Sequence, residues 1–309
     1  MCNAPLVSIC CLTYNHESFL RQCLDGFVMQ KTSFEFEIVV HDDASTDGTR
    51  EILAEYSLKY PTVFRLILQE ENQYSKGVDV LTHLFSHAKG KYIAFCEGDD
   101  YWTDPLKLQK QVDWLDQHSE YSICLSRCHF YDEESQKCLE VYPLYEDGDN
   151  VISLSKYVKG CNMPQTLTAV FRAHLLKASS YMHCQATCDM VIYYFLLKFG
   201  LGYCLPESTG VYRIHSKGIW SGMEFSKRRI WEINNVLSIC KVDNAIEAKQ
   251  FLLYQFLRPF SRKFILLNFG LFAKVYSVLS SSFGTISVLH IFIAKLLFNK
   301  NLHIDKICL

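Results

Sequence analysis

The sequence predicts an α/β protein with a doubly wound, mostly parallel central sheet flanked by helices, followed by a helical C-terminal region. Two observations support this fold class. Apolar runs of strand length alternate with amphipathic helical patterns through the first hundred residues, an order typical of parallel sheets with right-handed crossovers. Polar residues directly follow three of these runs, as they do where ligands bind at the carboxyl ends of parallel strands.

Each element of this first half has its own signal. The apolar runs are nearly continuous, which suits strands that are buried on both faces. Between them, apolar residues recur every three or four positions, which indicates helices with one buried face. Pro61 and Gly90 end two of these helices. We expect strands at residues 6–13, 36–40, 63–68 and 92–100, and helices at 17–30, 47–60 and 76–88.

The alternation weakens after the fourth strand. Asp104 and Pro105 form an N-cap and first helical residue, and the helix that they start runs to about His118. Shorter strands are expected between Tyr121 and Tyr212, with helices at 172–180 and 189–200. The sequence thus predicts one domain at 1–222, with halves at 1–105 and 106–222, and a helical, apolar and basic region at 223–309.

The C-terminal region contains an uncharged run at residues 275–294. Twenty residues are long enough to span a bilayer, but this run includes five serines, a threonine, a glycine and a histidine. These polar residues favour a buried helix or one that lies on a membrane surface over one that spans the membrane. Both arrangements remain open at this point.

Composition narrows the possible partners and location. The formal charge of −2 gives no electrostatic reason to expect a nucleic acid as partner, because proteins that bind one usually carry a basic excess. The fourteen cysteines are scattered, which indicates reduced thiols in a cytoplasmic protein. The pairs Cys124/Cys128 and Cys184/Cys188 could hold zinc, although ordinary buried thiols are the simpler interpretation.

The acidic segment Glu97-Gly98-Asp99-Asp100 follows the fourth strand directly. Its three carboxylates would repel one another unless a cation lay between them. Oxygen ligands with room for phosphate suit Mg²⁺ or Mn²⁺, which stabilises a diphosphate leaving group. We expect Asp100 and Asp99 to be metal ligands, and the role of Glu97 stays open; the alternative is a solvated acidic turn.

Four further polar groups could contribute to one site. Asp43 could bind a base or ribose, although its turn could also be only a helix N-cap. Arg213 could neutralise phosphate, and His215 could ligate the metal or serve a structural role. Asp189 opens a helix and could accept the proton of an attacking hydroxyl, or could merely cap that helix.

Residues 5–220 resemble the family 2 glycosyltransferases, which have the GT-A fold. The resemblance is carried by VSICCLTYNHESFLRQCLDGFVMQ, HDDASTDGT and EGDDYWTDPLKLQKQVDWL, in this order. It implies an inverting, metal-dependent transfer of sugar from a nucleotide diphosphate donor, and by resemblance alone this donor is a UDP-sugar. It also implies that Asp189 is the catalytic base, although Cys188 replaces the acid that often precedes this base in the family. It also implies that the donor is held by Thr13, Tyr14, Asn15, Asp42, Asp43, Asp99 and Arg213, and the Mn²⁺ or Mg²⁺ by Asp100, Asp99 and His215.

Relatives with such C-terminal regions act on saccharide or lipid-linked saccharide acceptors in surface polysaccharide or glycolipid assembly. We therefore expect a cytoplasmic protein that contacts the inner face of a membrane through residues 223–309. Two alternatives stay open. A nucleotidyltransferase would need a glycine-rich basic loop after the first strand, and Thr13 to Arg21 contains no glycine. A silent nucleotide- or carbohydrate-binding subunit would keep the fold without the activity.

Overall fold

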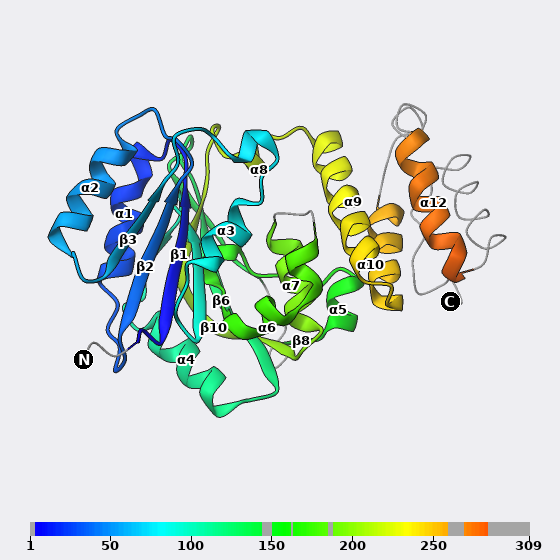
Figure 1. The fold of residues 1–309 in the computed structure, drawn as a ribbon, viewed down its shortest axis with the longest axis horizontal. Helices are drawn as coiled ribbons and strands as arrows, with labels where there is room; N and C mark the ends of the chain where they lie inside the picture. Colours follow the sequence, from blue (N-terminus) through cyan, green and yellow to red (C-terminus); the bar gives the residue numbers. More distant parts are fainter. Residues whose placement is uncertain (1–3, 144–149, 162, 185–187, 259–268, 284–309) are drawn as a thin grey trace.

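The computed structural model describes residues 4–143, 150–161, 163–184, 188–258 and 269–283. Its centre is one sheet in the order β3-β2-β1-β4-β9-β6-β10-β5, with β7 beside β6 and β8 beside β10 (Figure 1). The strands are β1 (Val7–Thr13), β2 (Phe36–Asp42), β3 (Phe64–Leu68), β4 (Tyr92–Glu97), β5 (Tyr101–Trp102), β6 (Tyr121–Asp132), β7 (Lys137–Tyr142), β8 (Val151–Ile152), β9 (Val170–Arg172) and β10 (Leu201–Ile214).

The helices pack on both faces of this sheet. They are α1 (Glu17–Val28), α2 (Thr49–Lys59), α3 (Val80–Ser86), α4 (Lys107–Gln117), α5 (Leu154–Val158), α6 (Ala173–Ala178), α7 (Asp189–Leu197), α8 (Ile219–Gly222), α9 (Phe225–Val242), α10 (Ile246–Leu257) and α12 (Phe269–Phe283). The buried side chains of α1, α2 and α4 form one hydrophobic cluster, and those of α3, α5, α6 and α7 form another. The sheet therefore lies between two helical layers, as predicted.

The first four strands are parallel, and β1 lies between β2 and β4. Thr13 of β1 is paired with Asp42 of β2, and Leu12 is paired with Glu97 of β4. The polar segments that follow these three strands therefore start at the same edge of the sheet. This confirms the predicted order of strands and helices in the first half, with boundaries shifted by a few residues.

The second half differs from the prediction in one respect. We expected shorter strands between Tyr121 and Tyr212, but β6 and β10 are the long strands of the sheet, with 12 and 14 residues. Pro206 and Gly210 interrupt the apolar pattern of β10, and its pairing with β6 shifts register around Ser208. Irregular pairing tolerates residues that break a regular strand. The strand β10 therefore continues through Pro206 and Gly210 to Ile214, and Arg213 lies near its end.

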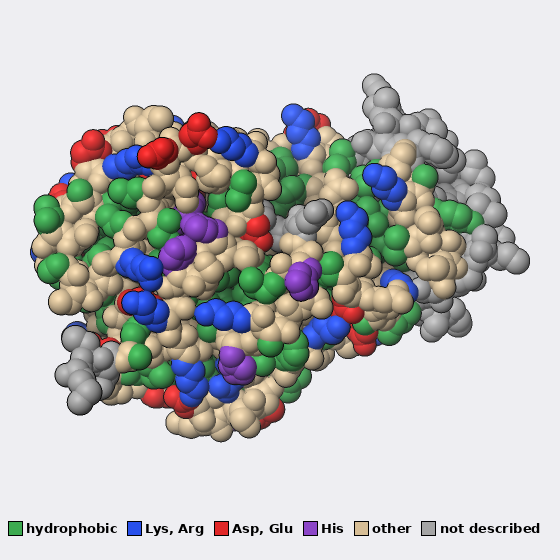
Figure 2. All heavy atoms as spheres, viewed as in Figure 1, with side chains coloured by type: hydrophobic (Ala, Val, Ile, Leu, Met, Phe, Trp, Pro, Cys, Tyr) green, Lys and Arg blue, Asp and Glu red, His purple; other side chains and the backbone are tan. Residues whose placement is uncertain are grey.

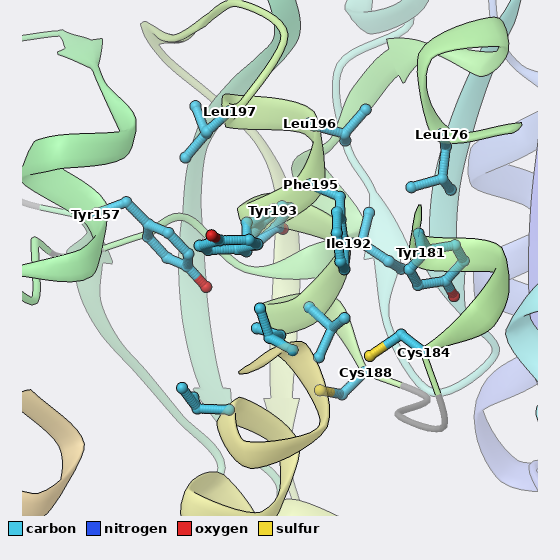
Figure 3. Packing of buried hydrophobic residues seen from close by; sticks show 14 of the residues in the cluster. Tyr157, Leu176, Tyr181, Cys184, Cys188, Ile192, Tyr193, Phe195, Leu196 and Leu197 are labelled. Atoms are coloured by element: carbon cyan, nitrogen blue, oxygen red, sulfur yellow. The ribbon is translucent and has the colours of Figure 1, made fainter. Parts of the chain in front are cut away.

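The C-terminal helices continue the core of the domain. All seven residues from Val191 to Leu197 on α7 are buried (Figure 3). Buried residues of α9, α10 and α12, such as Ile233, Phe251 and Leu279, belong to the same cluster. These C-terminal helices thus extend the cluster that contains the buried residues of α7, and a chain without them would expose part of an apolar helix to water.

None of the described helices combines the length and the apolar character that a membrane crossing requires. Of the uncharged run at 275–294, residues 275–283 belong to α12 and the remainder falls outside the described residues.

The described cysteines are all free, and Cys124 and Cys128 lie on β6 as strand residues. On the face drawn in Figure 2, basic and acidic side chains are interspersed.

Candidate active site

The polar strand ends open into one cavity of about 890 Å³. Its wall includes residues from both halves of the domain and from α8, α9 and α10. The predicted site residues that line it are Thr13, Tyr14, Asp43, Asp99, Asp189, Arg213 and His215. Within the described part of the chain, Asn15, Asp42 and Asp100 lie next to this wall in sequence but are not among its lining residues. Seven of the ten predicted side chains thus share one space.

Glu97, Asp99 and Asp100 form an acidic cluster in which one carboxylate oxygen of each lies within 4.8 Å of the others. Glu97 and Asp99 line the cavity, whereas the buried Asp100 accepts a hydrogen bond from the backbone N–H of Arg213 at 2.8 Å. Burial, together with Asp99 and Asp189, raises the pKa of Glu97 to about 8. Burial and its two acidic neighbours also raise the pKa of Asp100 far above its usual range.

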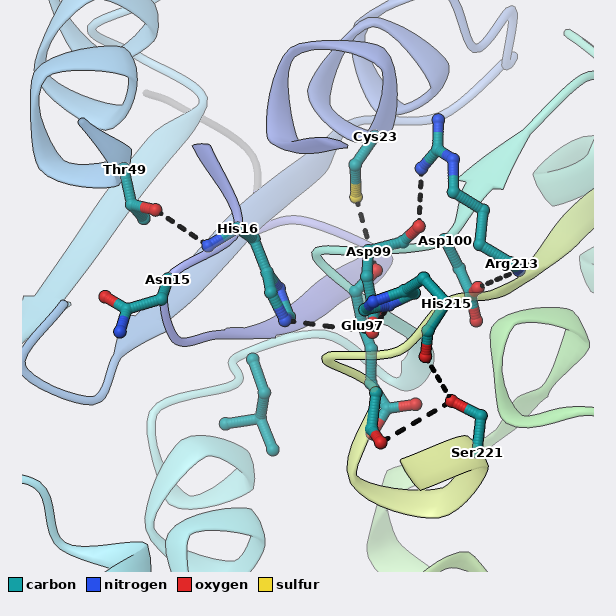
Figure 4. Close-up of polar contacts among 12 residues, drawn as sticks. Asn15, His16, Cys23, Thr49, Glu97, Asp99, Asp100, Arg213, His215 and Ser221 are labelled. Carbon is teal, nitrogen blue, oxygen red and sulfur yellow. Dashed lines mark hydrogen bonds and ion pairs between the residues drawn. The ribbon is translucent and has the colours of Figure 1, made fainter. Parts of the chain in front are cut away.

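Asp99 faces two imidazoles (Figure 4). His215 Nε2 lies 3.1 Å from Asp99 Oδ2, and His16 Nε2 lies 3.7 Å from the same oxygen. Burial works to raise the pKa of Asp99, but His16 and His215 outweigh it and hold this pKa below its usual range. His16 was not predicted from the sequence, because its position after Tyr14-Asn15 gives no sign that it turns toward β4.

The donor atoms in this corner fit a divalent cation. Three carboxylates crowded together, one buried and two half-buried, repel one another unless positive charge compensates them, and their oxygen atoms suit Mg²⁺ or Mn²⁺. Three buried polar atoms here have no hydrogen-bond partner within the described structure: Thr13 Oγ1, His16 Nδ1 and His215 Nδ1. A Cβ at Gly98 would come within 2.9 Å of His16 Nδ1 and 3.0 Å of Thr13 Oγ1. Any other residue at this position would therefore displace the His16 or Thr13 side chain.

Arg213 is engaged with protein groups. Its Nε lies 2.8 Å from Glu133, and its two terminal nitrogens donate to the Asp99 carbonyl and to Gln22. The guanidinium also lies 4.4 Å from the centre of the Tyr101 ring. Arg213 therefore joins β10 to α1 and to the acidic turn, and protein groups hold its guanidinium at the cavity wall rather than letting it project freely into the cavity.

Asp43 orders the loop that follows β3. Its two carboxylate oxygens accept the backbone N–H groups of Gln73 and Tyr74 at 2.7 and 3.0 Å. Asn72 donates to the Asp43 carbonyl, and Asn72 and Tyr74 both line the cavity. Tyr74 is 40% exposed and was not predicted as a site residue, because only the bonds to Asp43 bring this loop to the strand ends.

Asn15 and Asp42 support the turns beneath the cavity. Asn15 adopts a positive φ of 56°, and its side chain accepts the backbone N–H of Thr46 at 2.8 Å. Asp42 is fully buried and accepts Arg50 Nε at 2.7 Å and the Ser45 N–H at 3.1 Å. These contacts tie the β1–α1 turn to the β2–α2 turn, and so they position the cavity residues Thr13 and Asp43.

Asp189 is the first residue of α7 and faces the same cavity as Glu97. Burial raises its pKa. Thr166 Oγ1 donates to Asp189 Oδ2 at 3.3 Å, and the Met190 N–H approaches Oδ1 at 2.7 Å. A carboxylate with a raised pKa in a partly enclosed space can accept a proton at neutral pH. Gln165 and Thr166, which also line this part of the cavity, were not predicted.

The chain resembles known proteins in sequence and in fold. Residues 8–156 match the family model described as glycosyl transferase family 2. An uncharacterized protein of Mycobacterium tuberculosis is 38% identical over 231 residues, which cover 73% of this chain and 64% of that protein. The chain therefore spans less than two thirds of that relative.

Two solved structures share the fold. S. aureus TarS 1–349, solved in complex with UDP-GlcNAc, has a TM-score of 0.62 at 18% identity, covering 94% of this chain and 83% of its own. The mannosyltransferase PcManGT from Pyrobaculum calidifontis, in complex with GDP-Man and Mn²⁺, has a TM-score of 0.52 at 17% identity, covering 97% and 89%. The predicted GT-A fold is confirmed.

Proposed function

Since this chain belongs to the family 2 glycosyltransferases, we propose that it transfers a sugar from a nucleotide diphosphate donor to the hydroxyl group of an acceptor. The observation that carries the proposal is the shared cavity. Glu97, Asp99 and Asp189 all line it. A site for a metal–diphosphate and a site for a proton acceptor therefore open into the same space.

Glu97, Asp99 and Asp100 would hold the divalent cation, with His215 beside them. A cation bound there neutralises charge on the diphosphate as it leaves. The protein supports this corner through the Arg213 backbone N–H, which donates to Asp100, and through His16, which lies beside Asp99. We propose Mn²⁺ or Mg²⁺ as this cation.

Asp189 would act as the catalytic base of an inverting, single-displacement reaction. The acceptor oxygen forms a bond to the anomeric carbon while the bond from that carbon to the diphosphate breaks. The acceptor proton passes to the Asp189 carboxylate, and the nucleoside diphosphate leaves with the bonding electron pair. The raised pKa of Asp189 supports this role, because a more basic carboxylate is a better proton acceptor at neutral pH.

We propose a UDP-sugar as the donor. Tyr14 and Tyr74 offer exposed rings in the cavity, and Asp43 and Asn72, which share a hydrogen bond, also line it; rings and polar groups of this kind suit a base and ribose. The similar TarS structure was solved with UDP-GlcNAc, and the similar PcManGT structure with GDP-Man. The fold therefore accepts more than one base, and UDP is the choice that the family resemblance of the sequence supports.

We also propose that the enzyme works at the cytoplasmic face of a membrane, on a saccharide or lipid-linked saccharide in surface polysaccharide or glycolipid assembly. The free thiols and the apolar, basic character of residues 223–309 support this location. The test is flotation of the full chain with anionic lipid vesicles. Recovery only in the protein fraction would contradict contact with the membrane.

Thermal unfolding with nucleotides tests the transferase proposal directly. UDP with Mn²⁺ should raise the melting temperature, because a ligand at 100 times its Kd stabilises the folded state by about 2.7 kcal/mol. Asp99→Asn should remove this shift, whereas Asp113→Asn, on the exposed face of α4, should retain it. A shift with UTP alone would indicate a nucleotidyltransferase, and no shift with any nucleotide would indicate a silent subunit.

A further inference from the structure

The far wall of the cavity comes from the C-terminal helices, outside the segment that matches the family model. Its aromatic members include Trp220 on α8, Trp231 on α9 and Tyr254 on α10. The nucleotide and metal sites described above do not use these side chains. Asp189, the proposed base, lines the same cavity, so an acceptor that reaches Asp189 enters the space that these helices help to enclose.

Trp220 is the exposed member of this wall. Its side chain is 39% exposed, although large apolar side chains in a folded domain are usually buried. It follows His215 by one tight turn, in which Gly218 N–H and Ser221 Oγ both donate to the His215 carbonyl, at 3.1 and 2.6 Å. Because His215 contacts Asp99, this turn places the indole close to the reaction centre.

The indole of Trp220 is held in one orientation by two neighbours. The Trp231 ring packs edge-on against it, with ring centres 5.5 Å apart and planes at 64°. The Arg228 guanidinium lies 5.5 Å from its centre, and Arg228 also donates to the Met223 and Ser221 carbonyls at 2.7 and 3.2 Å. Within the described residues, Arg228 is not part of the cavity wall. The contacts thus fix the ring and leave a surface of it facing the cavity.

A fixed aromatic ring beside polar groups has the chemistry that recognises a sugar ring. The C–H face of a pyranose packs on an aromatic ring, while its hydroxyl groups need hydrogen-bond partners at the edge. Lys217, Ser221 and Glu232 line the same cavity as Trp220 and carry such polar groups. A small alcohol would leave the indole in contact with water, so the wall is shaped for a larger ring.

We propose that Trp220 is a stacking platform for a pyranose ring of the acceptor. This inference rests on the proposed transferase function and assigns a residue to the recognition of its saccharide acceptor. Trp231 and Arg228 are positioning residues in this arrangement, because they contact the indole rather than the sugar.

Acceptor kinetics test the platform. The probes are methyl glycosides of glucose, galactose, mannose and N-acetylglucosamine, with glycerol as the non-sugar alcohol. Trp220→Ala should raise the KM of the accepted glycoside roughly tenfold, as expected for the loss of one aromatic contact, while the affinity for UDP with Mn²⁺ stays within about twofold. Trp220→Phe should keep the glycoside KM within about threefold, because it retains a ring.

Phe225→Ala is the matched control. Phe225 is also aromatic and is 62% exposed, but it is not among the described residues that line the cavity, so its loss should leave the glycoside KM unchanged. The proposal is overturned if Trp220→Ala has the glycoside KM of the wild type, or if it weakens UDP binding as much as glycoside use. It is also overturned if the wild type uses glycerol as well as the glycosides, or uses no glycoside although it binds UDP.

Failure of the proposed function gives a different result. A wild type that shows no nucleotide-dependent stabilisation is not the proposed transferase, yet its binding of methyl glycosides remains measurable by tryptophan fluorescence. The platform predicts a glycoside-dependent blue shift in the wild type that disappears in Trp220→Phe, which removes this indole and leaves the other three tryptophans of the chain in place. A shift that persists in this variant, or no shift in the wild type, would contradict a saccharide on Trp220.

Discussion

His215 Nε2 lies 3.1 Å from Asp99 Oδ2, although 116 residues separate the two in the chain. The contact joins the end of β10 to the turn after β4, and His16 approaches the same carboxylate from the start of α1. Asp99 is therefore the point where three distant segments meet.

Replacing His215 should weaken the metal site. His215→Ala removes the imidazole beside Asp99, and loss of a group that orients a metal ligand typically costs 10–100-fold in metal affinity. We expect a decrease of roughly this size in Mn²⁺ affinity, measured by titration calorimetry with UDP present. His174→Ala, on the exposed face of α6, is the control. Unchanged Mn²⁺ affinity in His215→Ala would exclude His215 from the site.

Replacing Asp189 should separate binding from transfer. Asp189→Asn keeps the shape of the side chain and its hydrogen bond from Thr166, but it cannot accept a proton. We expect kcat to fall by at least ~10²-fold, while the thermal shift with UDP and Mn²⁺ remains. Normal turnover in this variant would mean that another group is the base. Thr166→Val removes only the hydroxyl group that donates to Asp189. It should lower kcat less than Asp189→Asn does, because the carboxylate remains.

Gly160 should be intolerant of a side chain for two separable reasons. Its φ is +88°, and an added Cβ would overlap the Tyr254 ring on α10. Gly77 has a similar φ of +75°, but nothing lies within 4 Å of an added Cβ there. Gly77→Ala should therefore cost only the backbone strain, about 1 kcal/mol, and Gly160→Ala more than that. Urea unfolding measures both, and equal losses would show that the Tyr254 contact is unimportant.

Asp243 should make the stability depend on pH. Burial acts to raise its pKa, but hydrogen bonds from Lys198 and Tyr194, at 2.6 and 2.7 Å, outweigh it and lower this pKa. A carboxyl whose folded pKa is lowered stabilises the fold above its unfolded pKa of about 3.9 and loses this contribution as the pH falls through the folded value. Asp243→Asn should therefore cost roughly 2 kcal/mol at pH 7 and progressively less below pH 4.

The exposed pair of Lys91 and Asp116 is the control for Asp243. Its members are 48% and 43% exposed, so Asp116→Asn should cost at most about 1 kcal/mol. The measurement is the free energy of unfolding in urea between pH 3 and 7 for the wild type, Asp243→Asn and Asp116→Asn. A cost of Asp243→Asn that does not change with pH would show that its charge contributes nothing to the fold.

The sequence by itself predicted the βαβα order, because buried parallel strands and amphipathic helices each leave a local pattern of apolar residues. It also placed Thr13, Asp43 and Asp99 at strand ends, and parallel pairing of β1 with β2 and β4 then brings those ends together. The elements of the first half and the acidic corner were therefore predictable from short-range signals.

The length of β10 was not predictable in this way. Pro206 and Gly210 read as breaks in a local pattern, whereas pairing with β6 carries the strand through them with shifts of register. The prediction missed His16 for the same reason, since its role depends on the approach of α1 to the turn after β4. Both features depend on partners that are far away in the chain.

Tertiary structure also decided what surrounds the predicted residues. Arg213 was predicted from its neighbours in sequence, but only the fold brings Glu133 and Gln22 to its guanidinium. Likewise, Trp220 lies on a four-residue helix without any motif, and it becomes part of the cavity only because α9 and α10 pack on α7. Local periodicity specifies elements, whereas side-chain partners depend on which elements the hydrophobic core brings together.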